Sequence, residues 1–377
     1  MRCISTAIAL FFVVWAGTTG CSRAEEFPLQ GRVVAGAPIP DSAMNALLKK
    51  HRVPGVSVAV VSGGKIDWAR GYGALEQGRP ERVDTLTLFQ AASISKPVAA
   101  ALALRMVERG DLALDEDVNG LLRTWKIPAS PASKGKAITL RMLLSHSAGL
   151  SMHGVPEFDE GVRLPTLVEI LDGKSVVSRD SVRVVIEPGT TYRYSGGGFI
   201  ILQLLVSDVT GRQFEDVVRE LVLMPAGMGS STFEQPLPSI LHGRAAVGHT
   251  SDGTPMPGRW HTLVEQATGG LWTTPLDLAS FAIRIWNSYH GKSDSLLSRR
   301  MAHEMLTRWV DDFGLGWYLP SAGVFRFQHG GGNGGYRCHM GLSVEYGNGL
   351  CIMTNGDEGE RVINETTDAI GHAYGWF

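Results

Sequence analysis

The sequence predicts a mixed α/β (α+β) fold, with one antiparallel sheet from the two chain ends, flanked by terminal helices, and an inserted, mostly helical domain. The first observation is an alternation of apolar and polar residues at 55–72 that returns after residue 313. The second is that the segment from 93 to about 287 has a mostly helical pattern. Strands at both ends around a helical middle indicate a sheet that joins the two ends.

The N-terminal elements are a helix and a hairpin. The run "DSAMNALLKKHRV" predicts a helix capped by Asp41 or Ser42. The runs "GVSVAVVS" and "KIDWARGY" flank Gly63 and Gly64, which is a strong signal for a two-residue hairpin connection.

The remaining elements set the expected domain boundaries. Four strand-like runs, "FGLGWYL", "VFRFQH", "YRCHMGLSVEY" and "LCIMTNG", precede a last helix, "GERVINETTDAIGHAYGW". We therefore expect a sheet domain from 25–90 and 295–377, and a helical domain from 91–294 that carries the Ser93 helix. The helices expected in the middle are 94–109, 139–146, 199–210, 214–223 and 275–288.

Composition describes an ordinary globular protein and excludes some partners. The chain has 377 residues, 44% of them apolar and 19% charged, with a net charge of −2. Acidic and basic residues are interspersed and no basic stripe is present, so we expect no nucleic-acid partner.

Residues 1–24 are typical of a secretory signal. Arg2 precedes the apolar run "AIALFFVVWAG", which is too short to span a membrane comfortably, and small residues follow. Cleavage before Cys21, as in a lipoprotein, and cleavage after Ala24 are both consistent with the pattern. Either route exports the protein, to the periplasm, to the medium, or to a membrane through a lipidated Cys21.

Two cysteines remain after the signal. A turn at Asn348 and Gly349 would place Cys351 opposite Tyr346, roughly 25 Å along the strand from Cys338. That separation is far beyond disulfide reach, so two buried free thiols are expected.

The pattern Ser-x-x-Lys occurs at Ser62, Ser93 and Ser133, and context separates the three. Ser62 lies beside the hairpin turn, and Ser133 lies in the Pro/Ser/Gly loop "PASPASKGKAI". Ser93 precedes the helix-forming run "VAAALALRMVERG", where Lys96 would share its face one turn along. A desolvated neutral lysine can take a serine proton, and a helix N-terminus favours developing negative charge. The alternative is an N-cap serine beside a solvated lysine.

Further motifs carry a resemblance to a known family. The stretches "LLSHSAGL", "PGTTYRYSGGGFIILQLL", "GGLWTTPLDLASF" and "FQHGGGNGGYRCHMGLSV" resemble, in order and spacing, the class C β-lactamase and penicillin-binding family of serine hydrolases. This β-lactamase-related family also includes D-alanyl-D-alanine carboxypeptidase- and esterase-like members. The resemblance runs from about Asp41 to the C-terminus and implies a serine β-lactamase-like fold.

The resemblance implies a role for each matched catalytic residue. Ser93 would be the acylated nucleophile and Lys96 its proton-accepting neighbour. Tyr194 matches the family tyrosine that moves protons to the leaving group and from the deacylating water. If the resemblance is set aside, Tyr194 is interpreted as a buried aromatic residue whose hydroxyl is hydrogen-bonded.

The same resemblance identifies a substrate-binding strand. His329, Gly330 and Gly331 match the family's Lys-Thr-Gly motif, which aligns the substrate. The backbone N–H groups of Ser93 and Gly332 would form the oxyanion hole. Taken alone, His329 is equally well explained as a strand-end residue.

Two departures from the family pattern bear on selectivity. Gly196 stands where the family has an asparagine that hydrogen-bonds substrate amides, which predicts a gap in the site. Ser195 and Asn333 are weaker site candidates beside it, and Asn333 is the candidate replacement donor. His329 replaces the family lysine. Because a histidine is often neutral at pH 7, it attracts a substrate carboxylate less than a charged lysine does. We therefore expect Gly196→Asn to favour amides over esters by roughly tenfold, the worth of one hydrogen bond.

The sequence motifs that would indicate a cofactor or a metal are incomplete or lie in the wrong context, so no cofactor and no metal are expected. Gly330, Gly332 and Gly335 satisfy G-x-G-x-x-G, but a strand follows them instead of a helix. The run "HEMLT" at His303 lacks the second histidine of a zinc-binding helix.

These observations predict an exported serine hydrolase that forms an acyl-enzyme through Ser93 and acts on esters or D-amino-acid-type amides. One alternative is a true class C-like β-lactamase or D,D-carboxypeptidase. Another is a non-enzymatic penicillin-binding sensor or envelope protein that acylates and then stalls. The expected partner in each case is a small-molecule ester, amide or β-lactam.

Overall fold

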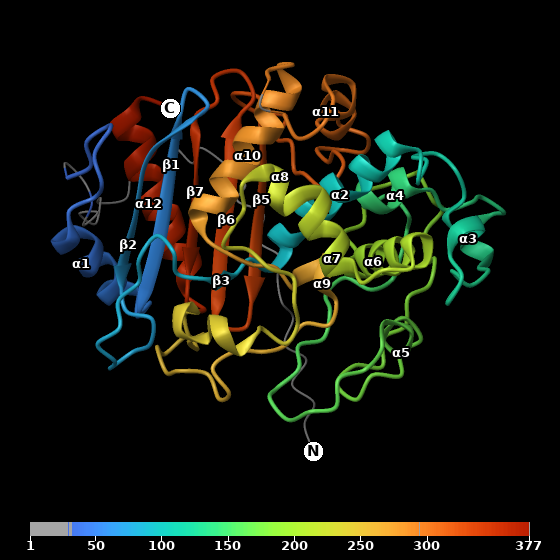
Figure 1. Cartoon of the computed structure of the whole chain (residues 1–377), viewed down its shortest axis with the longest axis horizontal. Helices are drawn as coiled ribbons and strands as arrows, with labels where there is room; N and C mark the ends of the chain where they lie inside the picture. The colour runs from blue at the N-terminus through green and yellow to red at the C-terminus, as the bar shows by residue number, and fades with distance from the viewer. Residues whose placement is uncertain (1–28, 30–31, 294, 377) are drawn as a thin grey trace, which may run out of the picture.

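The computed structural model describes residues 29, 32–293 and 295–376. In these residues, strands from the two ends of the chain form one five-stranded antiparallel sheet in the order β2-β1-β7-β6-β5 (Figure 1). β5 is an edge strand and lies beside the start of the helical part. The sheet strands are β1 Gly55–Ser62, β2 Lys65–Gly73, β5 Arg326–Asn333, β6 Tyr336–Ser343 and β7 Gly349–Thr354, and a separate pair is β3 Phe89–Gln90 with β4 Trp272–Thr273.

The N-terminal hairpin follows the sequence prediction. Ser62 pairs directly with Lys65, so Gly63 and Gly64 form the two-residue connection. Both glycines have positive φ, which such a turn requires and which a residue without Cβ adopts at low cost.

The terminal helices α1 and α12 cover one face of the sheet, and α10 covers the other (Figure 1). The alternation of side chains along β1 serves both layers. Val58 and Val60 pack with the terminal helices, whereas Ala59 and Val61 join the larger core with the helical part. The α-helices are α1 Asp41–His51, α2 Ser95–Arg109, α3 Val118–Leu121, α4 Leu140–Leu144, α5 Leu167–Leu171, α6 Gly196–Thr210, α7 Phe214–Val218, α8 Met224–Ala226, α9 Gln266–Gly269, α10 Pro275–Tyr289, α11 Arg299–Met305 and α12 Gly359–Tyr374.

Helix starts differ from the prediction in two places. α1 has Pro40 at its N-cap position and no side-chain cap, because the Asp41 carboxylate instead binds Arg70 at 2.9 Å. α6 begins three residues earlier than expected, since the Ser195 hydroxyl accepts the Gly198 N–H and caps the glycine run. The helix expected at 214–223 is α7 followed by a π-helical turn, 219–223.

The prediction of a strand at 313–319 is wrong. These residues form only isolated bridges, such as Phe313 with Tyr318 and Tyr318 with Gln328. The chain bends at Gly316, which has φ +82°. A Cβ there would lie 2.7 Å from Ala100 Cβ, so the bend packs the backbone closely against α2.

The two cysteines in the described part of the chain, Cys338 and Cys351, are buried and free, as expected, but the reason given for this from the sequence is wrong. The connection between β6 and β7 spans 344–348, longer than the predicted turn. Cys351 therefore faces Met340, and Cys338 faces Met353. The two thiols are diagonal neighbours on adjacent strands, where Cα atoms are typically farther apart than a disulfide tolerates.

The predicted signal and the predicted domain boundaries stay predictions. The predicted signal, 1–24, lies outside the described residues. Among the described residues, no helix is long and apolar enough to cross a membrane. The domain boundaries near 90 and 295 remain a prediction. α10, which belongs to the predicted helical domain, packs on the sheet.

The edge strand β5 meets the short 3-10 turn Ala92–Ile94 that precedes α2. A Cβ on Gly331 would lie 2.4 Å from the Ala91 carbonyl oxygen and 2.7 Å from Cys338 Sγ. At Gly330, the nearest atom to such a Cβ is 3.8 Å away. Only a glycine at 331 allows the turn to approach the strand this closely.

We expect Gly331→Ala to lower the free energy of unfolding by about 1–3 kcal/mol, because the turn must move away from β5. Gly330→Ala is the matched control and should change that free energy by less than about 0.5 kcal/mol. Urea denaturation of both variants measures the difference. Equal stability of the two would contradict the close contact.

Candidate active site

Ser93 lies in the 3-10 turn between β3 and α2, half-buried. The Ala91 N–H donates to the Leu271 carbonyl at 2.8 Å and fixes the turn to the chain beside β4. Ala92, directly before Ser93, has φ +47°. A left-handed alanine costs roughly 1–2 kcal/mol, and strain of this kind collects at functional sites. The sequence pattern predicted Ser93 at the start of the helix, but nothing in it indicated the strained backbone at Ala92.

Lys96 is the most unusual charged group near Ser93. Its Nζ lies 3.1 Å from Ser93 Oγ and donates to the Thr268 carbonyl at 2.8 Å. The side chain is 1% exposed, and no carboxylate of the described residues forms an ion pair with it. Burial lowers the pKa of Lys96 to about 7. The neutral amine is therefore well populated near neutral pH and can accept a proton.

Tyr194 completes a group of three with Ser93 and Lys96. Its hydroxyl donates to Ser93 Oγ at 2.9 Å, and its ring centroid lies 5.0 Å from Lys96 Nζ. Burial raises the pKa of Tyr194 above its usual value, so the phenol stays protonated. The structure thus brings together the three predicted catalytic residues, with a neutral base and a neutral acid at one oxygen.

Two histidines that were given no role from the sequence support Tyr194. The His146 ring stacks on Tyr194 with centroids 4.3 Å apart, and His153 lies 5.1 Å from it. His146 Nδ1 accepts the Ser195 N–H, and burial lowers the pKa of His146 well below its usual value. The motif "LLSHSAGL" contained this residue, but a contact with a side chain 48 positions away has no sequence signal.

The predicted substrate-binding strand is β5, and its free edge faces Ser93. Gln328 exchanges backbone hydrogen bonds with Tyr318, away from β6. Because outward and inward groups alternate along an antiparallel strand, Gly330 and Gly332 also direct their N–H groups to the free edge. The Gly332 N–H is therefore oriented to serve, with the Ser93 N–H, as an oxyanion donor.

His329 is buried on the same strand, near Tyr194, with ring centroids 6.5 Å apart. Its Nδ1 lies 2.6 Å from the Gly330 carbonyl, which fits a protonated Nδ1 as donor. Burial, and after it the charge of Lys96, lowers the pKa of His329 to about 3. The imidazole is neutral at pH 7 and supplies no positive charge for a substrate carboxylate.

The gap expected at Gly196 is not present. A Cβ on Gly196 would lie 2.9 Å from Val155 Cγ1 and 3.0 Å from the His153 carbonyl oxygen. The segment 153–155 therefore fills the space that an asparagine side chain needs. The Gly196 N–H donates to the His153 carbonyl at 2.9 Å, which fixes this segment against the start of α6.

The two weaker site candidates, Ser195 and Asn333, form hydrogen bonds within the protein. The Ser195 hydroxyl donates to the Met152 carbonyl at 2.7 Å while it caps α6. The Asn333 amide donates to Gln90 Oε1 at 2.8 Å and to the Gly269 carbonyl at 3.3 Å. With its NH₂ group so engaged, Asn333 does not offer the substrate-amide donor that was suggested for it.

The other two Ser-x-x-Lys pairs are structural, as predicted. Ser62 and Lys65 face each other beside the hairpin turn. The Ser133 hydroxyl donates to the Ser130 carbonyl, and Lys136 binds Glu187 at 2.7 Å. Neither serine has a buried amine beside it.

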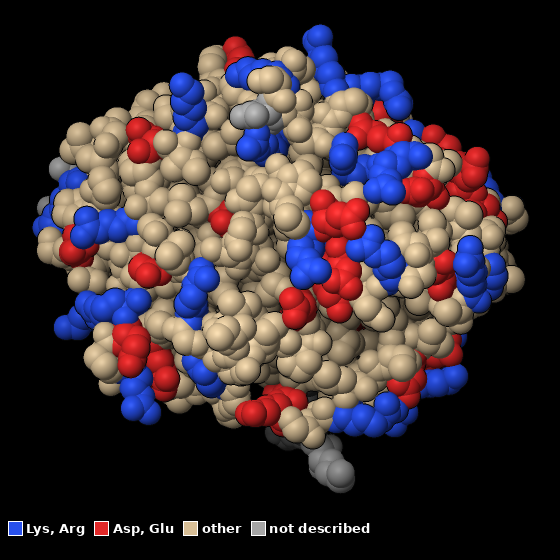
Figure 2. Space-filling view, in the orientation of Figure 1, with Lys and Arg blue, Asp and Glu red and all other residues tan. Residues whose placement is uncertain are grey.

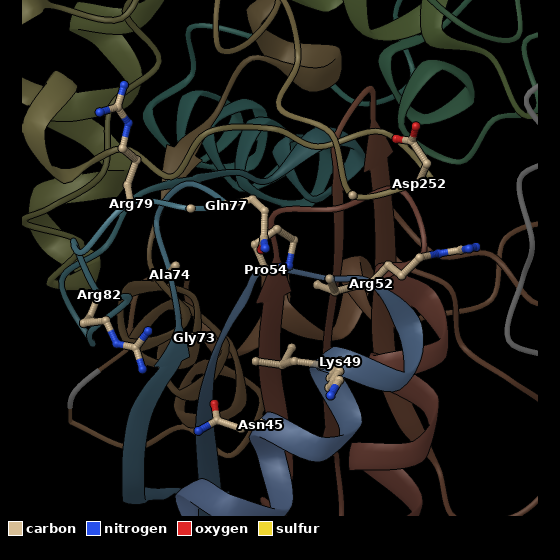
Figure 3. Close-up of a pocket in the computed structure, with 14 residues that line it drawn as sticks. Asn45, Lys49, Arg52, Pro54, Gly73, Ala74, Gln77, Arg79, Arg82 and Asp252 are labelled. Atoms are coloured by element: carbon tan, nitrogen blue, oxygen red, sulfur yellow. The ribbon is translucent and has the colours of Figure 1, made fainter.

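The surface away from Ser93 has two features, a mixture of charges on one face and a separate cavity. On the face shown in Figure 2, basic and acidic side chains are mixed instead of forming a patch of one sign. A cavity of about 530 Å³ lies between the end of α1, the start of β1 and the end of β2 (Figure 3). Arg52, Arg79 and Arg82 line it but point in different directions. None of the predicted site residues, all of them within the described part of the chain, lines this cavity.

A metal centre has no visible ligand set. In residues 29, 32–293 and 295–376, no group of three or more His, Cys, Asp or Glu side chains could hold a metal ion.

Comparison with known proteins identifies the family of the chain. Residues 40–374 match the family model described as Beta-lactamase. Penicillin-binding protein 4 of Amycolatopsis lactamdurans is 27% identical over 335 residues, 83% of each chain. Esterase EstB of Burkholderia gladioli is 30% identical over 233 residues, 60% of this chain and 57% of the esterase.

A solved structure supports the fold. The octameric penicillin-binding protein homologue from Pyrococcus abyssi superposes with a TM-score of 0.73 at 21% identity, covering 89% of this chain and 76% of that one. This likeness confirms the predicted antiparallel-sheet fold with its inserted helical part. The family match spans nearly the whole described chain, and the chain belongs to the β-lactamase family of serine hydrolases.

Proposed function

We propose that the protein hydrolyses small-molecule esters, and more slowly D-amino-acid-type amides, through an acyl-enzyme at Ser93. The observation that carries this proposal is the environment of Ser93 Oγ. A desolvated lysine amine lies 3.1 Å from it, and a protonated tyrosine hydroxyl lies 2.9 Å from it. Such a pair activates a serine hydroxyl, which is otherwise a poor nucleophile.

The chemistry follows from the protonation states. Neutral Lys96 accepts the Ser93 proton as Oγ attacks the substrate carbonyl. The resulting oxyanion accepts hydrogen bonds from the Ser93 and Gly332 N–H groups, typically worth about 3 kcal/mol for each donor. Tyr194 donates its proton to the leaving group, and the Lys96 ammonium restores it. A water then attacks the acyl-enzyme, gives its proton along the same path, and releases the acid and Ser93.

Two features favour esters over β-lactams and peptides. Gly196 offers no amide donor to the substrate, and Asn333 does not replace it. Neutral His329 supplies no fixed positive charge for the carboxylate that penicillins and D-Ala-D-Ala peptides carry. An ester loses less by lacking these contacts, because its carbonyl is a weaker acceptor and its leaving group departs more readily.

The relatives favour specific alternatives. The likeness to penicillin-binding protein 4 favours a β-lactamase or D,D-carboxypeptidase activity, or a penicillin-binding sensor that acylates and then stalls. The likeness to esterase EstB supports the first proposal.

We also propose export through residues 1–24, with lipid anchoring at Cys21 if cleavage occurs before it. The mass of the mature N-terminal peptide from the native host distinguishes the two cleavage sites.

The nucleophile is tested by intact mass after incubation with a fluorophosphonate and, separately, with a fluorescent penicillin. Wild type should gain the fluorophosphonate adduct and hydrolyse short-chain p-nitrophenyl esters, whereas Ser93→Ala should do neither. Ser62→Ala and Ser133→Ala are matched controls and should behave as wild type. Labelling of folded Ser93→Ala refutes the mechanism, and a persistent penicillin adduct on wild type without ester turnover favours the sensor.

The filled space at Gly196 reverses the earlier expectation for Gly196→Asn. The added side chain meets Val155 and the His153 carbonyl, so we expect about 1–3 kcal/mol of destabilisation and a lower ester turnover. Gly120→Asn, in open space on α3, is the control and should be nearly neutral. Thermal unfolding and the cephalosporin-to-ester rate ratio measure the effect. A stable variant with a ratio raised tenfold would restore the idea of an open gap.

A further inference from the structure

One feature near the active site is a buried carboxyl group, that of Glu265. Its side chain is 0% exposed, and among the described residues neither of its carboxylate oxygens has a hydrogen-bond partner. Glu265 directly precedes α9, the turn whose Thr268 carbonyl holds Lys96 and whose Gly269 carbonyl holds Asn333. An unpaired buried carboxyl costs several kcal/mol, so its retention here calls for a ligand or a function.

A second carboxylate, Glu157, faces the same region. Its two oxygens accept the Gly334 N–H at 3.1 and 3.2 Å, and its side chain is 20% exposed. Phe158 and Thr262 exchange two backbone hydrogen bonds, which bring the chain at Glu157 beside the chain that leads to Glu265. Burial, with a smaller contribution from the charge of Glu157, raises the pKa of Glu265 to about 8, so the two carboxyl groups lie within electrostatic range of each other.

The neighbouring charges leave this pair without a full counterion. His261 Nε2 lies 3.5 Å from Glu157, and its Nδ1 lies 2.9 Å from Asp159. Arg337 is paired with Asp357 at 3.1 Å. Among the described residues, no Lys or Arg forms an ion pair with either Glu157 or Glu265. The local environment therefore suits an added cation.

The pair lies on the acyl side of the reacting bond. Tyr194, the leaving-group acid, is close to His329 near the start of β5. Gly334 follows the other end of β5, two residues beyond the oxyanion donor Gly332. At about 3.4 Å per residue, Glu157 is reached roughly 7 Å beyond the oxyanion hole, in the direction away from the leaving group.

We propose that Glu157 and Glu265 form a subsite for an ammonium group carried by the acyl part of the substrate, several bonds from the scissile carbonyl. This inference rests on the proposed acyl-enzyme function and names its substrate class: esters or amides of acids with a distal amino group. The ammonium supplies hydrogen-bond donors to the unpartnered oxygens of Glu265 and offsets the charge of Glu157. No bond is made or broken at this subsite.

The test compares matched ethyl esters by pH-stat. The 6-aminohexanoate ester carries an ammonium six bonds from the carbonyl, and the heptanoate ester carries a methyl group in its place. Glycine and propanoate esters form a short pair whose ammonium does not reach the subsite. For wild type, kcat/KM should favour 6-aminohexanoate over heptanoate at least tenfold, with no such preference in the short pair.

Three variants assign the effect. Glu157→Gln and Glu265→Gln should each lower the long-pair ratio at least fivefold, while both fold, since glutamine keeps the shape but cannot carry the negative charge that pairs with a bound ammonium. Asp159→Asn is the control: this acid contacts His261 but is 70% exposed, and the ratio should stay at the wild-type value.

The outcomes separate the two proposals. Hydrolysis of both long esters at equal kcat/KM, or an unchanged ratio in folded Glu157→Gln and Glu265→Gln, overturns the subsite alone. Failure of all four esters, together with absence of a fluorophosphonate adduct at Ser93, overturns the proposed function and the subsite with it.

Discussion

The removal of Lys96 from water is the constraint on which the site depends. An ammonium in bulk water is a poor base at neutral pH, because its proton leaves only near pH 10. In this fold the amine is enclosed by α2, α9 and the ring of Tyr194, and its hydrogen bonds to protein are to one carbonyl and to Ser93. Burial without a counterion is costly for the charged form, and this cost turns the lysine into a base.

The site draws on both parts of the chain. The sheet contributes the free edge of β5, and the helical part contributes Ser93, Lys96 and Tyr194. Gly331 allows the two parts to approach closely, and Ala92 accepts a strained backbone at the same contact. The Lys96 amine itself is surrounded by groups of the helical part, namely the Thr268 carbonyl and the rings of Tyr194 and Phe199.

Much of the fold and site could be predicted from the sequence, where local pattern determines structure. The β1–β2 hairpin, α2 and α12 follow from periodicity and turn residues, and the motif order indicated Ser93, Lys96 and Tyr194. The failures concern long-range packing. The bend at Gly316 and the space filled by Val155 depend on segments distant in the chain, as does the His146 ring on Tyr194. The two unpaired acids, Glu157 and Glu265, are ordinary residues until the fold brings them together.

The most direct test of this account is the titration of Lys96 itself. Protein carrying lysine labelled with ¹³C at the ε carbon is followed by NMR from pH 5 to 11, and Lys96→Arg assigns the resonance by its loss. The account predicts a midpoint near 7 for this lysine, as its burial requires. A midpoint near 10.4, the value of a solvated lysine, would show that Lys96 is not desolvated and cannot be the base.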